Sequence, residues 1–356
     1  MSSSYGQRIR VTLFGQSHGE AIGMVLDGLP AGEPLDMEAL QVFLNRRAPG
    51  QSSLTSKRKE ADQPRFLSGI FQGRTCGAPL CGVIENTDTR SEDYQKLADI
   101  PRPGHADWPA WVKHHGYNDY RGGGHFSARL TAPFCIAGGI LLQMLARRGV
   151  TVHSRLLAVG SIQDQPWSPL SMDWPSPQPN EWGLPVSTPE TAAAMAHYIQ
   201  ETAKAGDSVG GVVECCVTGM PIGLGEPFFD SLESQISHVV FSIPAVKGIE
   251  FGSGFSSTML KGSENNDPYY ISNGTIRPKT NHHGGILGGL STGAPLVFRV
   301  AFKPTPSIAQ SQASVSILRC SPESLTIGGR HDPCVAIRAV PCVEAAAAIA
   351  LAEGIL

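Results

Sequence analysis

The sequence predicts one continuous domain of mixed α-helices and β-strands. Segments with strand periodicity and with helix periodicity both occur, and 41% hydrophobic residues in 356 suffice for a substantial core. The 40 glycines and 27 prolines favour short elements and ordered loops over a helical bundle. No internal repeat or interdomain linker stands out, so we expect a single domain over residues 1–356. A surface insertion is expected at about 163–189, where Pro, Ser and Trp are frequent.

The N-terminal part of the chain predicts two strands and a helix. Residues 8–14 alternate polar and apolar side chains, and residues 23–29 form a second apolar run. Asp36 can cap a helix that ends at Arg46 and Arg47, where the helix dipole favours cations. Structure alone could therefore explain these two arginines.

The rest of the chain predicts further elements of both kinds. Residues 51–62 are polar and indicate an exposed loop. In chain order we then expect a strand at 80–84, a buried helix at 133–148, a helix at 191–205, a buried strand at 209–217, a helix at 232–241, and a terminal helix at 341–356 that begins with Pro341.

Charge and cysteine content narrow the classes of function. A net charge of -3 gives no overall basic field, so we expect no nucleic-acid partner and no anionic membrane partner. The eight cysteines form neither a CxxC pair nor a regular disulfide framework, which favours reduced thiols. The N-terminus lacks the plan of a signal peptide, and no stretch of about 18 uninterrupted apolar residues occurs. We predict a cytoplasmic location.

Five glycine-rich segments carry reactive or charged residues. They lie at 15–19, 102–107, 121–129, 281–289 and 328–333. Glycines let the backbone approach a ligand with its amides pointing inward, a geometry suited to phosphates or a flavin ring. A connecting turn explains any one segment equally well. Together, their histidines and arginines favour one site for an anionic ligand.

Each of these residues also has a purely structural interpretation. His18 and His105 could be satisfied core histidines, Asp332 could form an ion pair with Arg330, and Arg46, Arg47, Arg58 and Lys59 could form a solvated face. The histidine pairs at 114–115 and 282–283 suggest a metal, but adjacent residues of an extended chain point to opposite faces. Neither HExxH nor a Cys/His quartet is present, and GxGxxG after a strand, Walker A and GxSxG are also missing. We predict no metal site.

Several of these motifs, in this order, resemble the chorismate synthase family. The principal ones are Phe14-Gly15-Gln16-Ser17-His18-Gly19, residues 102–107, Tyr120 to Gly124 with Ser127-Ala128-Arg129, and Gly329-Arg330-His331-Asp332-Pro333-Cys334. Residues 46–51, 245–248, 284–289 and 303–305 add to the match, which spans the chain from about Gly6 to Glu353.

The resemblance implies a fold and a reaction. The fold would be of the α+β class, a single-domain β-α-β sandwich with pseudo-symmetric halves, assembled as a homotetramer. The reaction would be that of a lyase in the shikimate pathway of aromatic amino acid biosynthesis. It eliminates phosphate (1,4-anti) from 5-enolpyruvylshikimate 3-phosphate to give chorismate, and it requires reduced FMN.

The resemblance also implies roles for individual residues. His18 would protonate the departing phosphate, and His105 would support the reduced, anionic flavin. Asp332, with Ser17 nearby, would relay the proton that flavin N5 removes from the substrate. The substrate's anionic groups would be held by Arg47, Arg58, Arg102, Arg129 and Arg330. FMN contacts would come from His125, Phe126, Ser127, Pro244, Ala245, Gly288, Lys303, Pro304, Thr305, Pro306, Ser307 and Arg330.

Some positions depart from the family's commonest pattern. Gln16 replaces an acidic residue, and His125 and Phe126 stand where Arg-Ser is usual. Ser53 stands where arginine is frequent, which weakens an NADPH contact there. NADPH is considered only as a possible reductant, and because no recognisable pyridine-nucleotide motif is present, we expect an external supply of reduced flavin. Two other functions remain open at this point: a divergent flavin-binding homologue with a different phosphorylated cyclohexene, and a metal-dependent phosphohydrolase.

Overall fold

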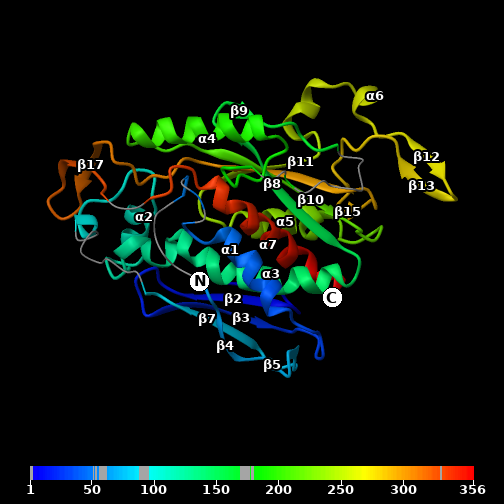
Figure 1. Cartoon of the computed structure of the whole chain (residues 1–356), viewed down its shortest axis with the longest axis horizontal. Helices are drawn as coiled ribbons and strands as arrows, with labels where there is room; N and C mark the ends of the chain where they lie inside the picture. The colour runs from blue at the N-terminus through cyan, green and yellow to red at the C-terminus, as the bar shows by residue number, and fades with distance from the viewer. Residues whose placement is uncertain are drawn as a thin grey trace.

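A computed structural model of the chain describes residues 3–50, 52, 54–55, 62–87, 96–168, 177, 180–328 and 331–356. Within these residues, two five-stranded antiparallel sheets enclose a layer of helices, as Figure 1 shows. The first sheet has the order β1-β2-β3-β7-β4, with β1 (Ser4–Tyr5), β2 (Arg10–Gly15), β3 (Ala21–Asp27), β7 (Leu80–Glu85) and β4 (Arg65–Ser68). The second has the order β11-β16-β10-β8-β9, with β11 (Val246–Phe251), β16 (Leu296–Phe302), β10 (Gly211–Thr218), β8 (Thr151–Val159) and β9 (Ile162–Gln163).

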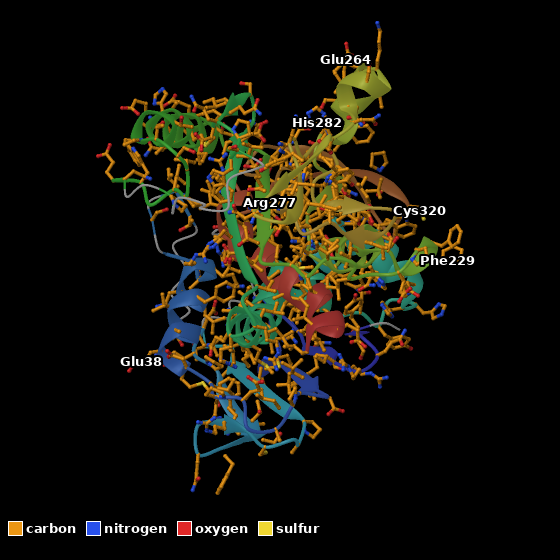
Figure 2. All side chains as sticks on the ribbon, turned by 90° about the vertical axis from the view of Figure 1, so that its right-hand side faces the viewer. Glu38, Phe229, Glu264, Arg277, His282 and Cys320 are labelled. Carbon is orange, nitrogen blue, oxygen red and sulfur yellow. The ribbon has the colours of Figure 1, made fainter. Side chains whose placement is uncertain are left out.

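Helices and short hairpins complete the fold. The helices are α1 (Met37–Arg47), α2 (Asp107–Lys113), α3 (Thr131–Ala146), α4 (Pro189–Lys204), α5 (Leu232–Val240), α6 (Gly262–Asn265) and α7 (Ala336–Ile355). The hairpins are β5 (Ile70–Phe71) with β6 (Arg74–Thr75), β12 (Tyr269–Ser272) with β13 (Thr275–Pro278), β14 (Ile286–Leu287) with β15 (Leu290–Ser291), and β17 (Gln312–Ser316) with β18 (Ser321–Leu325). The segment with α6, β12 and β13 projects beyond the second sheet (Figure 1), and Glu264 of α6 lies at its upper end in Figure 2.

The two halves of the chain repeat one order of elements. In each half two strands pair with each other (β2 with β3, β8 with β10), and a helix follows (α1, α5); in the second half β9 and α4 lie between the paired strands in sequence. The next strand lies at the sheet edge (β4, β11), and a later one lies between it and the first pair (β7, β16). A long helix then closes each half (α3, α7). The predicted sandwich with pseudo-symmetric halves is therefore confirmed.

Helices α3 and α7 form the centre of the molecule, where α3 faces the first sheet and α7 the second. The backbones of the two helices pack almost in contact at Gly138, because a Cβ added there would lie 2.3 Å from the Cβ of Ala345. One cluster of buried apolar side chains runs through both helices and both sheets. The stretch Ala128–Ala146 is long and apolar enough to cross a membrane by composition, but 83% of it is buried inside the protein. A core helix passes the same test.

Most predicted elements lie where the sequence pattern puts them. Asp36 caps α1, since its Oδ1 accepts a hydrogen bond from Ala39 N at 2.9 Å. The terminal helix is an exception, because α7 begins at Ala336 and Pro341 lies inside it. Pro341 cannot donate to the carbonyl four residues earlier, but Ile337 and Val340 are buried in the core. Burial of the helical turn at 336–340 stabilises α7 enough to offset the one missing hydrogen bond.

The exposed loop predicted at 51–62 is wrong where the structure describes it, and the surface insertion expected at about 163–189 stays a prediction, although some of its described residues are buried. Within 51–62, Leu54 and Asp62 are each 2% exposed. Within 163–189, Asp164, Leu184 and Val186 are buried. Both segments have a polar overall composition, but each contains apolar or ion-paired residues that are buried against the core.

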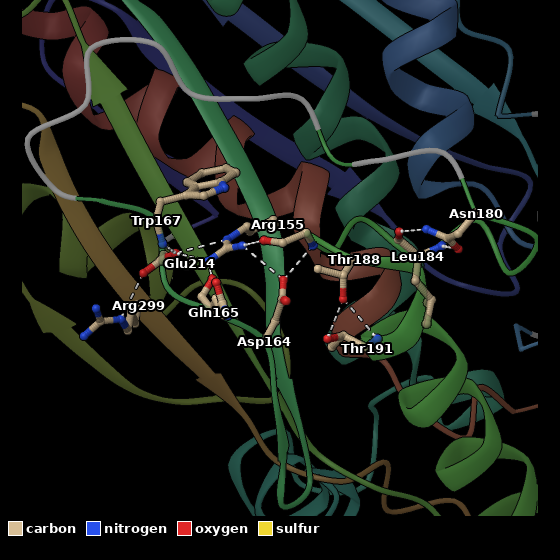
Figure 3. Close-up of polar contacts among 11 residues, drawn as sticks. Arg155, Asp164, Gln165, Trp167, Asn180, Leu184, Thr188, Thr191, Glu214 and Arg299 are labelled. Atoms are coloured by element: carbon tan, nitrogen blue, oxygen red, sulfur yellow. Dashed lines mark hydrogen bonds and ion pairs between the residues drawn. The ribbon is translucent and has the colours of Figure 1, made fainter.

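A row of alternating charges crosses the second sheet and explains the burial of Asp164. Arg155 on β8 lies opposite Glu214 on β10, which lies opposite Arg299 on β16. Figure 3 shows this row, in which Arg155 Nη2 lies 3.0 Å from Glu214 Oε2 and its Nη1 lies 3.0 Å from Asp164 Oδ2. The Trp167 ring covers the Arg155 guanidinium at 4.6 Å. The segment after β9 is thus fastened to the sheet by buried ion pairs.

Candidate active site

A cavity of about 670 Å³ opens where segments that are far apart in the sequence converge. Its volume falls within the range of about 300–1,000 Å³ that is usual for ligand and cofactor pockets. Its lining comes from residues 102–106 before α2, 122–131 before α3, 241–247 after α5, 302–307 after β16, and 331–342 at the start of α7, together with Arg47 at the end of α1. Four of the five predicted glycine segments lie at or against this cavity.

Positive charge dominates the walls. Among the described residues, the cationic side chains that line the cavity are Arg47, Arg102, Arg129, Lys247, Lys303 and Arg338. The one lining carboxylate among these residues is Asp332, while Asp62 and Asp107 contact arginines of the wall. Six cations against three carboxylates leave a net attraction for anions.

Arg47 and Arg129 share a single buried carboxylate. Asp62 Oδ2 lies 2.8 Å from Arg47 Nη2, and Asp62 Oδ1 pairs with Arg129 Nη1. Burial raises the pKa of Asp62, but the charges of the two arginines outweigh it and hold the pKa below its ordinary value. Asp62 therefore stays ionised and fixes both guanidinium groups at the cavity wall.

Arg102 and His105 meet on a second carboxylate. Asp107 accepts hydrogen bonds from Arg102 Nε at 2.7 Å and from His105 Nδ1 at 2.6 Å. Burial raises the pKa of Asp107, but these bonds and charges outweigh it and hold the pKa far below its ordinary value. His105 Nδ1 must then carry the proton, because an ionised carboxylate only accepts. This tautomer leaves His105 Nε2 to act as the acceptor in the neutral ring.

The glycine turn at 122–124 separates the two predicted catalytic histidines. Gly122 has φ of 59°, and a Cβ there would lie 2.4 Å from the His18 ring and 2.8 Å from Ser17 Oγ. A Cβ on Gly123, at φ of 86°, would lie 3.0 Å from the His105 ring. Both positions need glycine for backbone conformation and for space.

Ser17 and His18 lie behind this turn and are not among the lining residues. Both are buried, and Ser17 Oγ lies 3.2 Å from His18 Nδ1. Gly122, which they contact, does line the cavity. The structure therefore brings His18 to the edge of the cavity, and the turn stands between its ring and the open space.

A β-bulge and a left-handed residue shape the wall on the side of the second sheet. The β11–β16 register shifts between Val246 and Gly248, so Lys247 is the additional residue of a bulge. Ala245 has φ of 75°, a strained value for a non-glycine residue, and its carbonyl accepts from Lys303 N at 2.9 Å. Burial lowers the pKa of Lys303, and the charge of Lys247 lowers it further. An anion between the two lysines would relieve their repulsion.

Asp332 joins the site through Arg338. Asp332 Oδ2 lies 2.5 Å from Arg338 Nη1, and Arg338 Nε donates to the Arg47 carbonyl at 2.8 Å. The predicted ion pair of Asp332 with Arg330 is not tested, because Arg330 and Arg58 lie outside the described residues. The Asp332 carboxylate instead connects the wall to the end of α1.

Comparison with known proteins identifies the family of this chain. The family model described as chorismate synthase matches residues 9–356. The chain belongs to the chorismate synthase family. A chorismate synthase of Chitinophaga pinensis is 46% identical over 354 residues, covering 99% of this chain and 96% of that protein. One of Korarchaeum cryptofilum is 44% identical over 354 residues, covering 99% and 97%. A crystal structure of chorismate synthase aligns with a TM-score of 0.74 at 26% identity, covering 98% of this chain and 91% of the other.

Most residues that the chorismate synthase motifs assign to the flavin line the cavity. These are His125, Phe126, Ser127, Pro244, Ala245, Lys303, Thr305, Pro306 and Ser307. Pro304 and Gly288 are not among the lining residues, and Gly288 lies in the turn of the β14–β15 hairpin. Their contact with a cofactor stays a prediction.

Two of the departures from the commonest family pattern, His125 and Phe126, lie at the cavity wall. His125 Nδ1 donates to the Gly15 carbonyl at 2.8 Å, and Ser3 Oγ lies 2.9 Å from His125 Nε2. His125 thus fastens the end of β2, two residues before Ser17, to the glycine turn. Phe126 is 40% exposed and lines the cavity, so its ring offers an apolar face there.

Among the charged and titratable residues of the wall and its support, sequence reasoning assigned no role to Asp62, Asp107, Lys247, His331 and Arg338. Lys247 and His331 stand inside quoted motifs, and their charge was a usable signal. Asp62 stood in a polar stretch, and Arg338 in the N-terminal part of α7 that the pattern did not predict. Neither had a local signal, because both act through residues distant in the chain.

The histidine pair at 282–283 lies apart from the cavity lining. Asp267 accepts hydrogen bonds from the backbone N–H groups of both residues, at 2.8 and 3.1 Å, and His283 Nε2 lies 3.4 Å from its Oδ2. Across the residues that the structure describes, no group of three or more His, Cys, Asp and Glu side chains could hold a metal ion. The pair has a structural partner in Asp267.

Proposed function

We propose that this protein catalyses the 1,4-anti elimination of phosphate from 5-enolpyruvylshikimate 3-phosphate, which yields chorismate, with reduced FMN as cofactor. The observation that carries the proposal is the convergence of six cations on one cavity beside His18 and His105. Such a site suits a substrate with one phosphate and two carboxylates.

The arginines would bind and orient the substrate. Arg47, Arg102 and Arg129 each have a carboxylate partner that fixes the guanidinium plane and leaves charge directed to the cavity. Charge-assisted hydrogen bonds from such fixed groups to phosphate or carboxylate are among the strongest in proteins. Orientation by preformed groups would lower the entropy cost of reaching the transition state.

The histidines and Asp332 would hold the protons. Neutral imidazole and imidazolium interconvert near pH 7, so His18 can supply a proton to the departing phosphate. His105, with its Nδ1 proton held by Asp107, would present Nε2 toward Gly123 and the cavity. Asp332 lines the wall as an acceptor for the proton lost from the substrate.

The residues present fit a flavin mononucleotide. Lys247 and Lys303 suit its phosphate, Phe126 and the backbone at 244–245 suit its ring, and the cavity volume accommodates it. Bound reduced FMN would supply transient electron donation to the substrate. The chain's own residues would orient the two molecules and exclude water from between them.

An anaerobic assay tests the proposal. Purified protein, dithionite-reduced FMN and 5-enolpyruvylshikimate 3-phosphate should release phosphate and form chorismate in equal amounts. Saturating reduced FMN without chorismate formation would overturn the proposal, and phosphate release that a chelator abolishes but flavin does not affect would indicate a phosphohydrolase. A parallel reaction with oxidised FMN and NADPH tests our expectation that reduced flavin comes from outside.

We also propose assembly into a homotetramer and a cytoplasmic location. Support for assembly comes from large exposed apolar side chains on the projecting segment and on residues 254–259 before it: Phe255, Met259 and Ile271 are 80%, 81% and 76% exposed. Exposed apolar groups of this kind often mark interfaces. Light scattering of the purified protein would give the mass, and a monomer at micromolar concentration would contradict the assembly.

A further inference from the structure

Two cysteines from the central helices meet at the floor of the cavity. Cys135 on α3 donates a hydrogen bond to Cys342 on α7, with 3.7 Å between the two sulphurs. Cys342 lines the cavity and is 2% exposed, while Cys135 is fully buried behind it. The reaction proposed above uses neither thiol.

The helix packing allows the two residues to be joined. One turn further along each helix, Gly138 and Ala345 lie so close that a Cβ on Gly138 would be 2.4 Å from Ala345 Cα. A disulfide requires Cα atoms about 4.4–6.8 Å apart, and such close packing one turn away favours a separation of this order. Since a disulfide has sulphurs about 2.05 Å apart, rotation of the side chains must close a gap of about 1.7 Å.

The surroundings make the two thiols unequal. The hydrogen bond from Cys135 lowers the pKa of Cys342, burial raises it, and the charges of Arg47 and Arg338 lower it again, with a net lowering. Burial raises the pKa of Cys135 well above its ordinary value. Because the thiolate is the nucleophile, Cys342 is the more reactive member, and it is the one that lines the cavity.

We propose that Cys135 and Cys342 form a peroxide-sensitive dithiol site, in which Cys342 is oxidised first and Cys135 then closes a reversible disulfide. The Cys342 thiolate attacks one oxygen of hydrogen peroxide, the O–O bond breaks, and Cys342 sulfenic acid and hydroxide result. The sulphur of Cys135 then attacks the Cys342 sulphur while its proton goes to the departing hydroxyl, which leaves as water. Two electrons pass from the thiols to the peroxide, and an external thiol reverses the process.

Peptide mapping of the unaltered chain tests the disulfide. Trypsin cleaves after Arg129, Arg147 and Arg338, so Cys135 and Cys342 fall in peptides 130–147 and 339–356, each with one cysteine. After peroxide treatment of the folded protein, we expect these two peptides to be linked, and dithiothreitol to separate them. Recovery of both as free thiols, under conditions that oxidise the exposed Cys76, would overturn the proposal.

Two variants test the order of the steps. In Cys135→Ser, Cys342 should accumulate as a sulfenic acid that dimedone traps, whereas in Cys342→Ser, Cys135 should remain unlabelled. Labelling of Cys135 alone would reverse the assigned roles. Cys334→Ser is the matched control, because burial raises the pKa of this buried thiol to about 11. The control should form the same linked peptides as the unaltered chain.

Discussion

Asp62 and Arg47 form an ion pair at 2.8 Å, with side chains only 0% and 2% exposed. The same carboxylate pairs with Arg129 through its other oxygen. One residue from a polar stretch therefore sets the positions of two arginines at the cavity wall. If it loses its charge, two buried cations lose their common partner.

Asp62→Asn should destabilise the protein strongly. Removing one partner of a buried ion pair typically costs about 3–5 kcal/mol, because the remaining charge stays desolvated. Urea unfolding would measure the loss. Asp36→Asn is the matched control, because asparagine caps a helix as well as aspartate does and Asp36 is not buried. Equal stability of the two variants would show that Asp62 does not hold the arginines.

Asp62 also predicts a pH dependence. Its folded-state pKa is lowered relative to the ordinary value of about 3.9, so its contribution is present above that value and is lost as the pH falls through the folded pKa. The stability difference between the unaltered chain and Asp62→Asn should therefore be constant from pH 7 to about 5 and shrink below about 4. If the stability difference between the two proteins increased as the pH fell, Asp62 would not be ionised and paired with Arg47 and Arg129 in the folded protein.

Gly122→Ala should impair catalysis more than stability alone explains. A Cβ there would lie 2.4 Å from the His18 ring, so the ring or the turn must move. Misplacement of a reacting group by about 1 Å can lower the rate about 10²-fold. Gly149→Ala is the control, because Gly149 has φ of 79° but open space around its missing Cβ. Turnover measured well below both melting temperatures should be much lower for Gly122→Ala than for Gly149→Ala. Equal turnover would show that His18 takes no part in the reaction.

Glu214→Gln tests the charge row of the second sheet. Glu214 Oε2 accepts from Arg155 Nη2 at 3.0 Å, and Oε1 accepts from Arg299 Nε at 3.2 Å. Loss of this buried charge should lower the free energy of unfolding by about 3–5 kcal/mol. The exposed pair of Glu201 with Lys204 gives the contrast, since Glu201→Gln should leave the free energy of unfolding nearly unchanged. Similar small losses in both variants would show that the row adds little.

The sequence predicted what depends on local pattern. The start of α1 follows from Asp36, which caps the helix. The positions of β7 and β10 follow from their runs of apolar residues. The family motifs predicted the sandwich and one shared site for Arg102, His105 and Arg129, and the structure places all three at one cavity.

Features that arise from tertiary contacts could not be predicted in this way. Lys247 owes its place in the wall to a register shift against β16, and periodicity does not encode such a shift. Pro341 lies inside α7 because the core buries the preceding turn, which overrides a local rule about proline. Asp62 looked like a loop residue until Arg47 and Arg129 met it from other elements.

Asp332→Asn should lower turnover by about 10²–10⁴-fold with little effect on FMN affinity, because an amide cannot accept the substrate's proton. The ion pair with Arg338 at 2.5 Å offers a competing explanation, in which Asp332 only holds that guanidinium in place. Arg338→Gln separates the two explanations. If Asp332 accepts the proton, Arg338→Gln, which keeps the Asp332 carboxylate, should lower turnover much less than Asp332→Asn does. An equal fall in turnover in both variants would make Asp332 a positioning residue.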